Sequence, residues 1–163
     1  MKKLTYSTTF YCLLFTACCS LFTACGDKKD PKMEEAGKIH LEAMEIEETL
    51  HEQVEGIDSL KIVLNDKKKT VTDAAAIASI DSTVAALDAV AKSFEEWEEN
   101  LVEVPGLAHE HHHHEGEEHH HDHKPAPDVS GDQMIEIQKE IKANIQKIKS
   151  DLVSAEERVK KVL

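Results

Sequence analysis

The stretch MIEIQKEIKANIQKIKSDL, Met134–Leu152, decides the fold. Its apolar residues recur at alternating steps of three and four, which is the spacing of a coiled-coil seam. Mixed charges occupy the other faces, and Ser130 or Asp132 is suited to cap the start of the helix. A helix over 131–163 is therefore predicted. Its seam has Gln138 as a polar break and consists of Met134, Ile141, Ile145, Ile148, Leu152, Ala155, Val159 and Val162.

The segment 31–64 has the same period. Asp30 is a good N-cap and Pro31 is favoured at the first helical position. Gly37 and Gly56 each weaken a helix by about 1 kcal/mol relative to alanine, so a bend or local loosening is expected there. The turn NDKKKT follows the helix. The predicted seam, interrupted by Gln53, consists of Ala36, Ile39, Ala43, Ile46, Leu50, Ile57, Leu60 and Leu64.

A further helix is predicted over 73–104. Thr72 or Asp73 would cap it, and Pro105 with Gly106 would end it. Its last turns are acidic, EEWEEN, which is unfavourable at a helix C-terminus because the helix dipole is negative there. The seam consists of Ile77, Ile80, Val84, Leu87, Ala91, Phe94, Trp97 and Leu101.

The three helices match in length. At ~1.5 Å per residue, helices of about 30 to 34 residues extend about 45 to 50 Å. They favour an all-α fold, an antiparallel three-helix bundle over 31–163 with a disordered His/Glu-rich loop at 105–128. An intermolecular coiled coil through the last helix, in a homo- or hetero-oligomer, is the alternative. In the bundle, the second helix returns the loop to the end where the first helix begins.

The N-terminus is typical of a secretory signal peptide, with two lysines, a short apolar run and small residues before a cysteine. The string LFTAC occurs twice, ending at Cys18 and Cys25, and each copy resembles a bacterial lipobox. Cleavage before Cys25 uses the more apolar run and leaves the charged tether GDKKD, so residues 1–24 are predicted to be removed and Cys25 to be lipidated. An uncleaved transmembrane anchor is the alternative, although the run falls short of about 20 apolar residues.

The predicted mature chain is strongly acidic. Removal of residues 1–24 takes two of the 19 Lys and Arg and none of the 32 acids, which leaves 17 against 32 and a formal charge of -15. Such a chain is a poor partner for nucleic acids and anionic lipid surfaces, and a reasonable one for cations. Cys25, the one remaining cysteine, would be used by the lipid anchor, so no intramolecular disulfide is expected.

Nine of the eleven histidines lie between Gly106 and Asp128. Neutral imidazole binds Zn, Ni, Cu and Co, and carboxylates complete a coordination sphere, so this loop predicts labile metal binding of low selectivity. No tightly bound cofactor is expected. The predicted ligands are His109, His111, His112, His113, His114, His119, His120, His121 and His123, with Glu110, Glu115, Glu117, Glu118 and Asp122 as further ligands.

Two other interpretations of this loop remain open. With neutral histidines the segment 109–123 carries five negative charges, and with nine protonated ones it carries a net +4, so mild acidification would reverse its sign. This change would draw the loop toward the acidic end of the second helix. Alternatively, the loop is an inert, solvated spacer.

Other chemistry-bearing residues favour packing roles. His40 and Met44 lie one turn apart and suggest a copper site, but a helix histidine beside a methionine is usually ordinary packing. We expect His51 to face solvent, as part of an acidic helix face EAMEIEETLHEQVE, and Phe94 and Trp97 to fill one end of the bundle. The sequence contains no phosphate-binding glycine loop, nucleophile elbow or free reactive thiol, which predicts that the protein is not an enzyme.

The motifs CGDKKD, KIHLEAM, LDAVAKSFEEWEENL and MIEIQKEIKANIQKIKSDL together resemble a family of small uncharacterised lipoproteins of the Bacteroidetes, some of which are labelled "viral A-type inclusion protein". Ser93 and Trp97 match the second-helix motif of that family, and His40 matches its first-helix histidine. Around the tryptophan, where many members have methionines and a histidine, this chain has Ala91, Phe94, Glu95 and Glu98. The resemblance implies a helical lipoprotein and no particular activity.

These observations predict a lipoprotein of the cell envelope, anchored to the outer membrane on its periplasmic or surface face, that binds divalent transition metals reversibly. The alternative is a structural or interaction protein of coiled-coil type whose loop is inert or pH-responsive.

Overall fold

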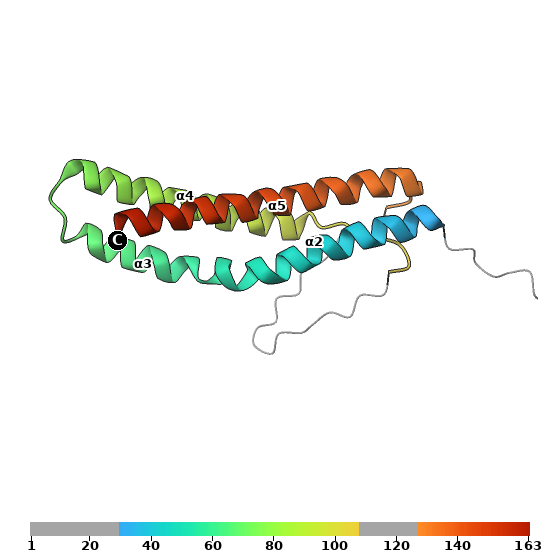
Figure 1. The fold of residues 1–163 in the computed structure, drawn as a ribbon, viewed down its shortest axis with the longest axis horizontal. Helices are drawn as coiled ribbons and strands as arrows, with labels where there is room; N and C mark the ends of the chain where they lie inside the picture. Colours follow the sequence, from blue (N-terminus) through green and yellow to red (C-terminus); the bar gives the residue numbers. More distant parts are fainter. Residues whose placement is uncertain (1–29, 108–126) are drawn as a thin grey trace, which may run out of the picture.

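The computed structural model describes residues 30–107 and 127–163, and the secondary structure in these residues is helical apart from one bridge residue, Val102. The all-α prediction is confirmed. The helices are α2 (Pro31–Glu55), α3 (Ile57–Lys68), α4 (Ala74–Glu99) and α5 (Gly131–Val162). Figure 1 shows α2 and α3 following one another along the molecule, α4 running back beside them, and α5 again running in the direction of α2.

The seam of α5 is buried as predicted from Met134 to Val159, and its last predicted member, Val162, is half-buried. The seam packs against α2 along most of its length and against α4, while α3 packs mainly on α4. Met134, Ile145 and Leu152 are almost fully buried, and so is the polar Gln138. The apolar stripe of α5 is therefore covered within one chain.

The other two seams are shifted by one residue at several positions. In α2 and α3, the residues at exact seven-residue spacing, from Ala36 to Leu64, are buried as predicted, but His40 is buried where Ile39 was expected. In α4, Thr83 and Val90 are buried in place of Val84 and Ala91. Periodicity alone does not distinguish two adjacent residues at the edge of a stripe, and the neighbouring helices decide which one turns inward.

The first predicted helix is divided. α2 ends at Glu55, and α3 begins at Ile57 and continues to Lys68, four residues beyond the predicted end at 64. Gly56 joins them in a right-handed helical conformation, and its N–H still donates to the Glu52 carbonyl at 3.3 Å, so backbone hydrogen bonding continues across the division. At Gly37, where loosening was also expected, α2 is continuous, and the glycine instead gives room to Leu107.

The second predicted helix ends early. α4 stops at Glu99, not at 104, and the chain then runs extended, which buries Leu101 and Val104. The acidic last turn opposes the helix dipole, and beyond the helix the Val102 carbonyl accepts a hydrogen bond from Nε2 of Gln138 on α5. The segment closes in a turn from Val104 to Leu107, in which Gly106 has a φ of 76°.

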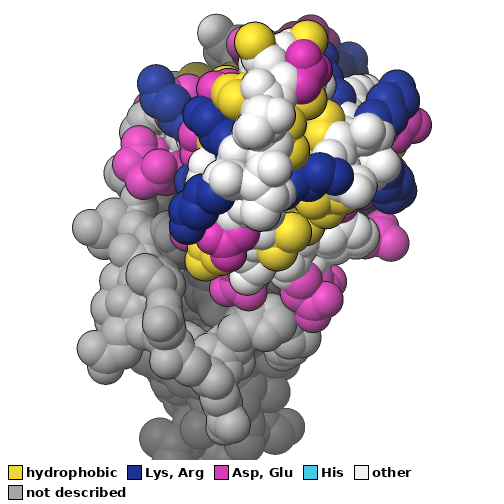
Figure 2. All heavy atoms as spheres, turned by 90° about the vertical axis from the view of Figure 1, so that its left-hand side faces the viewer, with side chains coloured by type: hydrophobic (Ala, Val, Ile, Leu, Met, Phe, Trp, Pro, Cys, Tyr) yellow, Lys and Arg dark blue, Asp and Glu magenta, His cyan; other side chains and the backbone are white. Residues whose placement is uncertain are grey.

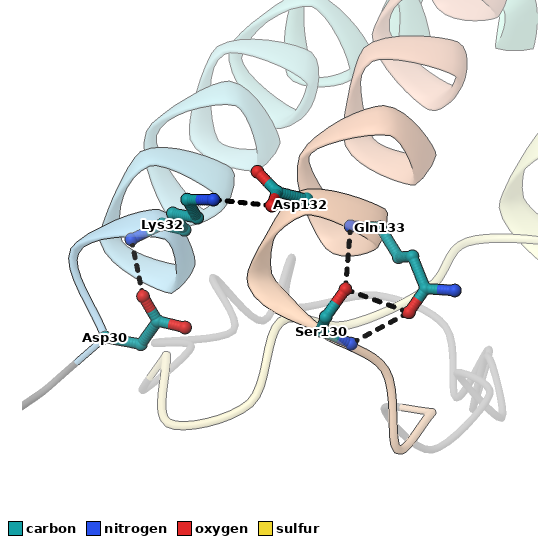
Figure 3. A network of polar contacts seen from close by, with 5 residues as sticks. All are labelled: Asp30, Lys32, Ser130, Asp132 and Gln133. Carbon is teal, nitrogen blue, oxygen red and sulfur yellow. Dashed lines mark hydrogen bonds and ion pairs between the residues drawn. The ribbon is translucent and has the colours of Figure 1, made fainter.

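The starts of α2 and α5 lie side by side, as Figure 3 shows. Asp30 accepts a hydrogen bond from the Lys32 N–H at 2.9 Å, and Lys32 forms an ion pair with Asp132 on α5. Ser130 and Gln133 cap α5 reciprocally, which confirms Ser130 as its N-cap. Because Leu107 contacts α2 near Gly37, the described flanks of the segment 108–126 and the start of α2 share one end of the molecule.

By length and composition α4 is also apolar enough to cross a membrane. Its exposed positions, however, include Asp81 and Asp88, which pair with Lys68 and Lys61 of α3. We therefore interpret α4 as a helix packed in the fold.

Candidate functional site

Charge is distributed unevenly along the helices. α2 contains eight glutamates and two lysines, a net charge of -6, whereas α3 contains three lysines and two aspartates, a net charge of +1. Figure 2 shows the end of the molecule where α3 turns into α4, with Lys and Arg side chains among apolar and acidic ones. A cation is therefore attracted toward α2 and away from the α3 end.

One imidazole and two carboxylates converge between α2 and α4. Glu47 and His51 are one turn apart on α2, and Glu98 comes from α4; one ligand atom from each lies within 4.8 Å of the others. Nδ1 of His51 is 3.6 Å from Glu47 Oε1 and 3.8 Å from Glu98 Oε1. A third carboxylate, Glu55, approaches the other ring nitrogen, Nε2, at 3.4 Å.

Helix periodicity explains this convergence. Glu47, His51 and Glu55 are spaced by four residues, so they lie on one face of α2. On α4, Phe94 and Glu98 are likewise four apart, and the Phe94 ring lies 6.1 Å from the His51 ring at an angle of 56°. The buried Phe94 and Trp97 hold this turn of α4 in the core, which brings Glu98 to the histidine.

The carboxylates facing Nδ1 are largely shielded from water. The side chains of Glu47 and Glu98 are 19% and 16% exposed, whereas that of Glu55 is 70% exposed. Placing two carboxylates together in a half-buried position is costly unless positive charge accompanies them. A cation, or a protonated His51, supplies such a charge.

The expectation that His51 faces solvent is thus met only in part. The side chain is 35% exposed and lies between two helices. Neither helix reveals the cluster by itself, because Glu98 is 47 residues away in sequence, from 51 to 98. In the sequence, this cluster is indicated by the spacing of Glu47, His51 and Glu55 at intervals of four residues on a helix with an apolar seam.

A second polar group is buried near the described flank of the histidine-rich loop. Nδ1 of His40 lies 3.0 Å from Oε1 of Gln138, and Nε2 of Gln138 donates to the Val102 carbonyl at 2.8 Å. His40 is 1% exposed and Gln138 is 0% exposed. This network joins α2, α5 and the extended segment after α4. Its hydrogen bonds fit the packing role expected for His40 better than they fit a copper site formed with Met44.

Ser93 and Trp97 border a shallow groove between α4 and α5, together with Asn100, Asn144 and Lys147. The Trp97 indole N–H donates to the Ile141 carbonyl at 2.9 Å, and the residue is only 7% exposed. Trp97 therefore connects the two helices through this hydrogen bond, and little of its surface is accessible to a ligand.

The remaining predicted sites lie outside the described residues. These are the lipidation site, Cys25, and every predicted metal ligand of the loop, from His109 to His123. Comparison with protein-family models, with curated proteins and with solved structures finds no match to this chain.

Proposed function

We propose that this chain is a lipid-anchored protein of the bacterial cell envelope that binds divalent transition-metal ions reversibly and is not an enzyme. The observation that carries the proposal is the convergence of Glu47, His51 and Glu98 within 4.8 Å on two helices. Imidazole with carboxylates is a ligand set for Zn, Co and Ni, and the strongly acidic α2 raises the local concentration of cations.

In this proposal the chain has two kinds of metal ligand. The loop residues His109 to His123 would form a labile reservoir, as the sequence predicts. The helices would form an antiparallel three-helix bundle that carries a smaller, fixed cluster. Because the start of α2 and both described flanks of the loop share one end of the molecule, an anchor at Cys25 would hold the reservoir near the membrane.

The proposal extends to the anchor and its membrane. Residues 1–24 would be the signal peptide, 25–30 the lipidated tether, and the acylated protein would reside in the outer membrane on its periplasmic or surface face. Its resemblance to small Bacteroidetes lipoproteins supports this placement. Several acyl chains hold a protein to a bilayer far more firmly than one.

The alternative function, a structural or interaction protein, has one observation in its favour. Large apolar side chains are exposed on three helices, with Leu41 at 53%, Ile62 at 63% and Val153 at 49%. A partner chain covering such residues would make the helices an assembly surface and the loop inert.

Titration of the full-length chain in detergent with Zn²⁺, Ni²⁺ and Cu²⁺ tests the proposal. Micromolar or tighter binding of several ions is expected, and most of the capacity should disappear when residues 109–123 are replaced by a Gly/Ser segment of equal length. Equal titration curves for the two chains would rule out the loop as the reservoir. An absence of binding by both would contradict the proposed function as a whole.

A further inference from the structure

The two ring nitrogens of His51 face different carboxylates. Nδ1 points to the shielded pair, Glu47 and Glu98, and Nε2 points to the exposed Glu55. A neutral imidazole has one N–H and one lone pair, and a carboxylate beside one nitrogen stabilises the proton on that nitrogen. When an ion is bound at Nδ1, the imidazole proton is on Nε2, the nitrogen that faces Glu55.

The spacing around Nδ1 fits a small cation. With metal–ligand bonds of about 2.0 to 2.2 Å, two ligand atoms of a tetrahedral zinc ion are about 3.4 Å apart. Nδ1 is 3.6 Å from the Glu47 oxygen and 3.8 Å from the Glu98 oxygen. Each of these two contacts would have to shorten by about 0.2 to 0.4 Å, and the two glutamate oxygens, which lie within 4.8 Å of each other, would have to reach the same separation of about 3.4 Å.

We propose that Nδ1 of His51, Glu47 and Glu98 bind one divalent ion of the zinc class, Zn²⁺, Co²⁺ or Ni²⁺, and that Glu55 is a positioning residue that holds the proton on Nε2. The inference rests on the proposed function, and it assigns a fixed site separate from the loop. Three protein ligands leave a position for water or for another donor. An imidazole in the set disfavours Ca²⁺ and Mg²⁺, which take oxygen ligands.

An ion at this site would link two helices that otherwise meet little. α2 packs mainly on α5, and α4 packs on α5 and α3, so α2 and α4 have few direct contacts. Glu47 and His51 belong to α2, and Glu98 is the residue before the last in α4. Binding would therefore stabilise the end of α4 against α2, and unfolding should report on it.

The test uses the full-length chain in which the nine histidines of the loop, His109 to His123, are changed to serine. Isothermal titration should show one equivalent of Zn²⁺ bound, and Co²⁺ should give the visible absorption of a bound ion. Glu47→Gln with Glu98→Gln should remove this binding. Glu55→Gln, which touches no ion, should weaken it by about 10- to 100-fold, as loss of a carboxylate behind a histidine ligand does in other sites.

Matched control variants distinguish ion binding at this site from general attraction of cations to the negative charge of the helices. Glu48 and Glu99 are exposed neighbours on the same two helices, so Glu48→Gln with Glu99→Gln removes the same charge and should leave Zn²⁺ binding within about twofold, since the ligands stay in place. Glu52→Gln is the corresponding control for Glu55. Circular dichroism of each variant establishes that the helices are intact.

The outcomes distinguish the inference from the proposed function. If the serine variant binds nothing while the unmodified chain binds several ions, the fixed site does not exist and the reservoir remains. If neither chain binds metal, both ideas fail. Binding by the serine variant that survives Glu47→Gln with Glu98→Gln would also overturn the assignment, because the ion would then lie elsewhere.

Discussion

At the residue scale, three polar side chains are buried among the described helices: His40, Thr83 and Gln138. Thr83 satisfies its hydroxyl locally by donating to the Ser79 carbonyl at 2.8 Å. Gln138 instead connects two other segments through His40 and Val102, so its position depends on both. A polar residue within an apolar seam favours one register of the helices because only one register satisfies it.

Gln138→Leu should therefore destabilise the protein although it makes the seam more apolar. The Val102 carbonyl would lose its Gln138 donor and His40 its Gln138 acceptor, and each lost buried partner costs about 1 to 3 kcal/mol. Urea denaturation measures the change. Gln146→Leu, the same substitution at an exposed position of α5, should alter stability by less than about 0.5 kcal/mol. A Gln138→Leu protein as stable as the original would show that the network contributes nothing.

At the element scale, the structure depends on how closely the starts of α2 and α5 approach. Gly131 is the first residue of α5, and a Cβ placed there would lie 2.5 Å from the Lys32 Cβ and 2.9 Å from an Asp30 oxygen. The absence of a side chain at Gly131 thus allows the capped helix starts in Figure 3 to lie together. Gly37 differs, because its hypothetical Cβ would meet only the end of the flexible Leu107 side chain, at 3.1 Å.

Gly131→Ala should consequently lower the free energy of unfolding by about 1 to 3 kcal/mol, because the two helix starts must move apart. Alanine is the better helix former by about 1 kcal/mol, so propensity alone predicts the opposite sign. Gly37→Ala provides the matched control and should cost much less, since the leucine can rotate away. Thermal unfolding of both variants checks the prediction, and an equal effect of the two would refute it.

At the scale of the whole molecule, ion pairs link neighbouring helices of this acidic protein. Lys61 pairs with Asp88 across the α3–α4 contact, at 2.7 Å, and also with Asp58 in its own helix. The hydrogen bond to Asp88, followed by that to Asp58, raises the pKa of Lys61 above 10.5. The pKa values of Lys32 and Lys139 are raised in the same direction, chiefly by hydrogen bonds to Asp132 and Glu136 respectively.

The sign of the pH effect follows. A lysine whose pKa is higher in the folded state than in the unfolded state makes its full contribution to stability at pH values below its unfolded-state pKa. This contribution disappears as the pH rises through the folded-state pKa. Lys61→Gln should therefore lower the midpoint of thermal unfolding at pH 7 to 9, and the difference from the original protein should shrink above pH 10.5. Lys160→Gln, at the exposed far end of α5, should show a smaller difference throughout. If the difference in unfolding midpoint between the Lys61→Gln variant and the original protein does not change with pH, this account is contradicted.

Much of the fold was determined by the sequence itself. Apolar spacing from Met134 to Val159 predicted the buried face of α5. Asp30, Thr72 or Asp73, and Ser130 or Asp132 were the predicted caps, and the structure has Asp30, Asp73 and Ser130, because capping and periodicity are local properties. Only the tertiary structure decided that α4 ends at Glu99, that His40 and not Ile39 turns inward, and that His51 meets Glu98. Each of these depends on a neighbouring helix: the Val102 carbonyl is held by Gln138 of α5, and two glutamates from separate helices approach one imidazole because Phe94 and Trp97 bury the last turns of α4.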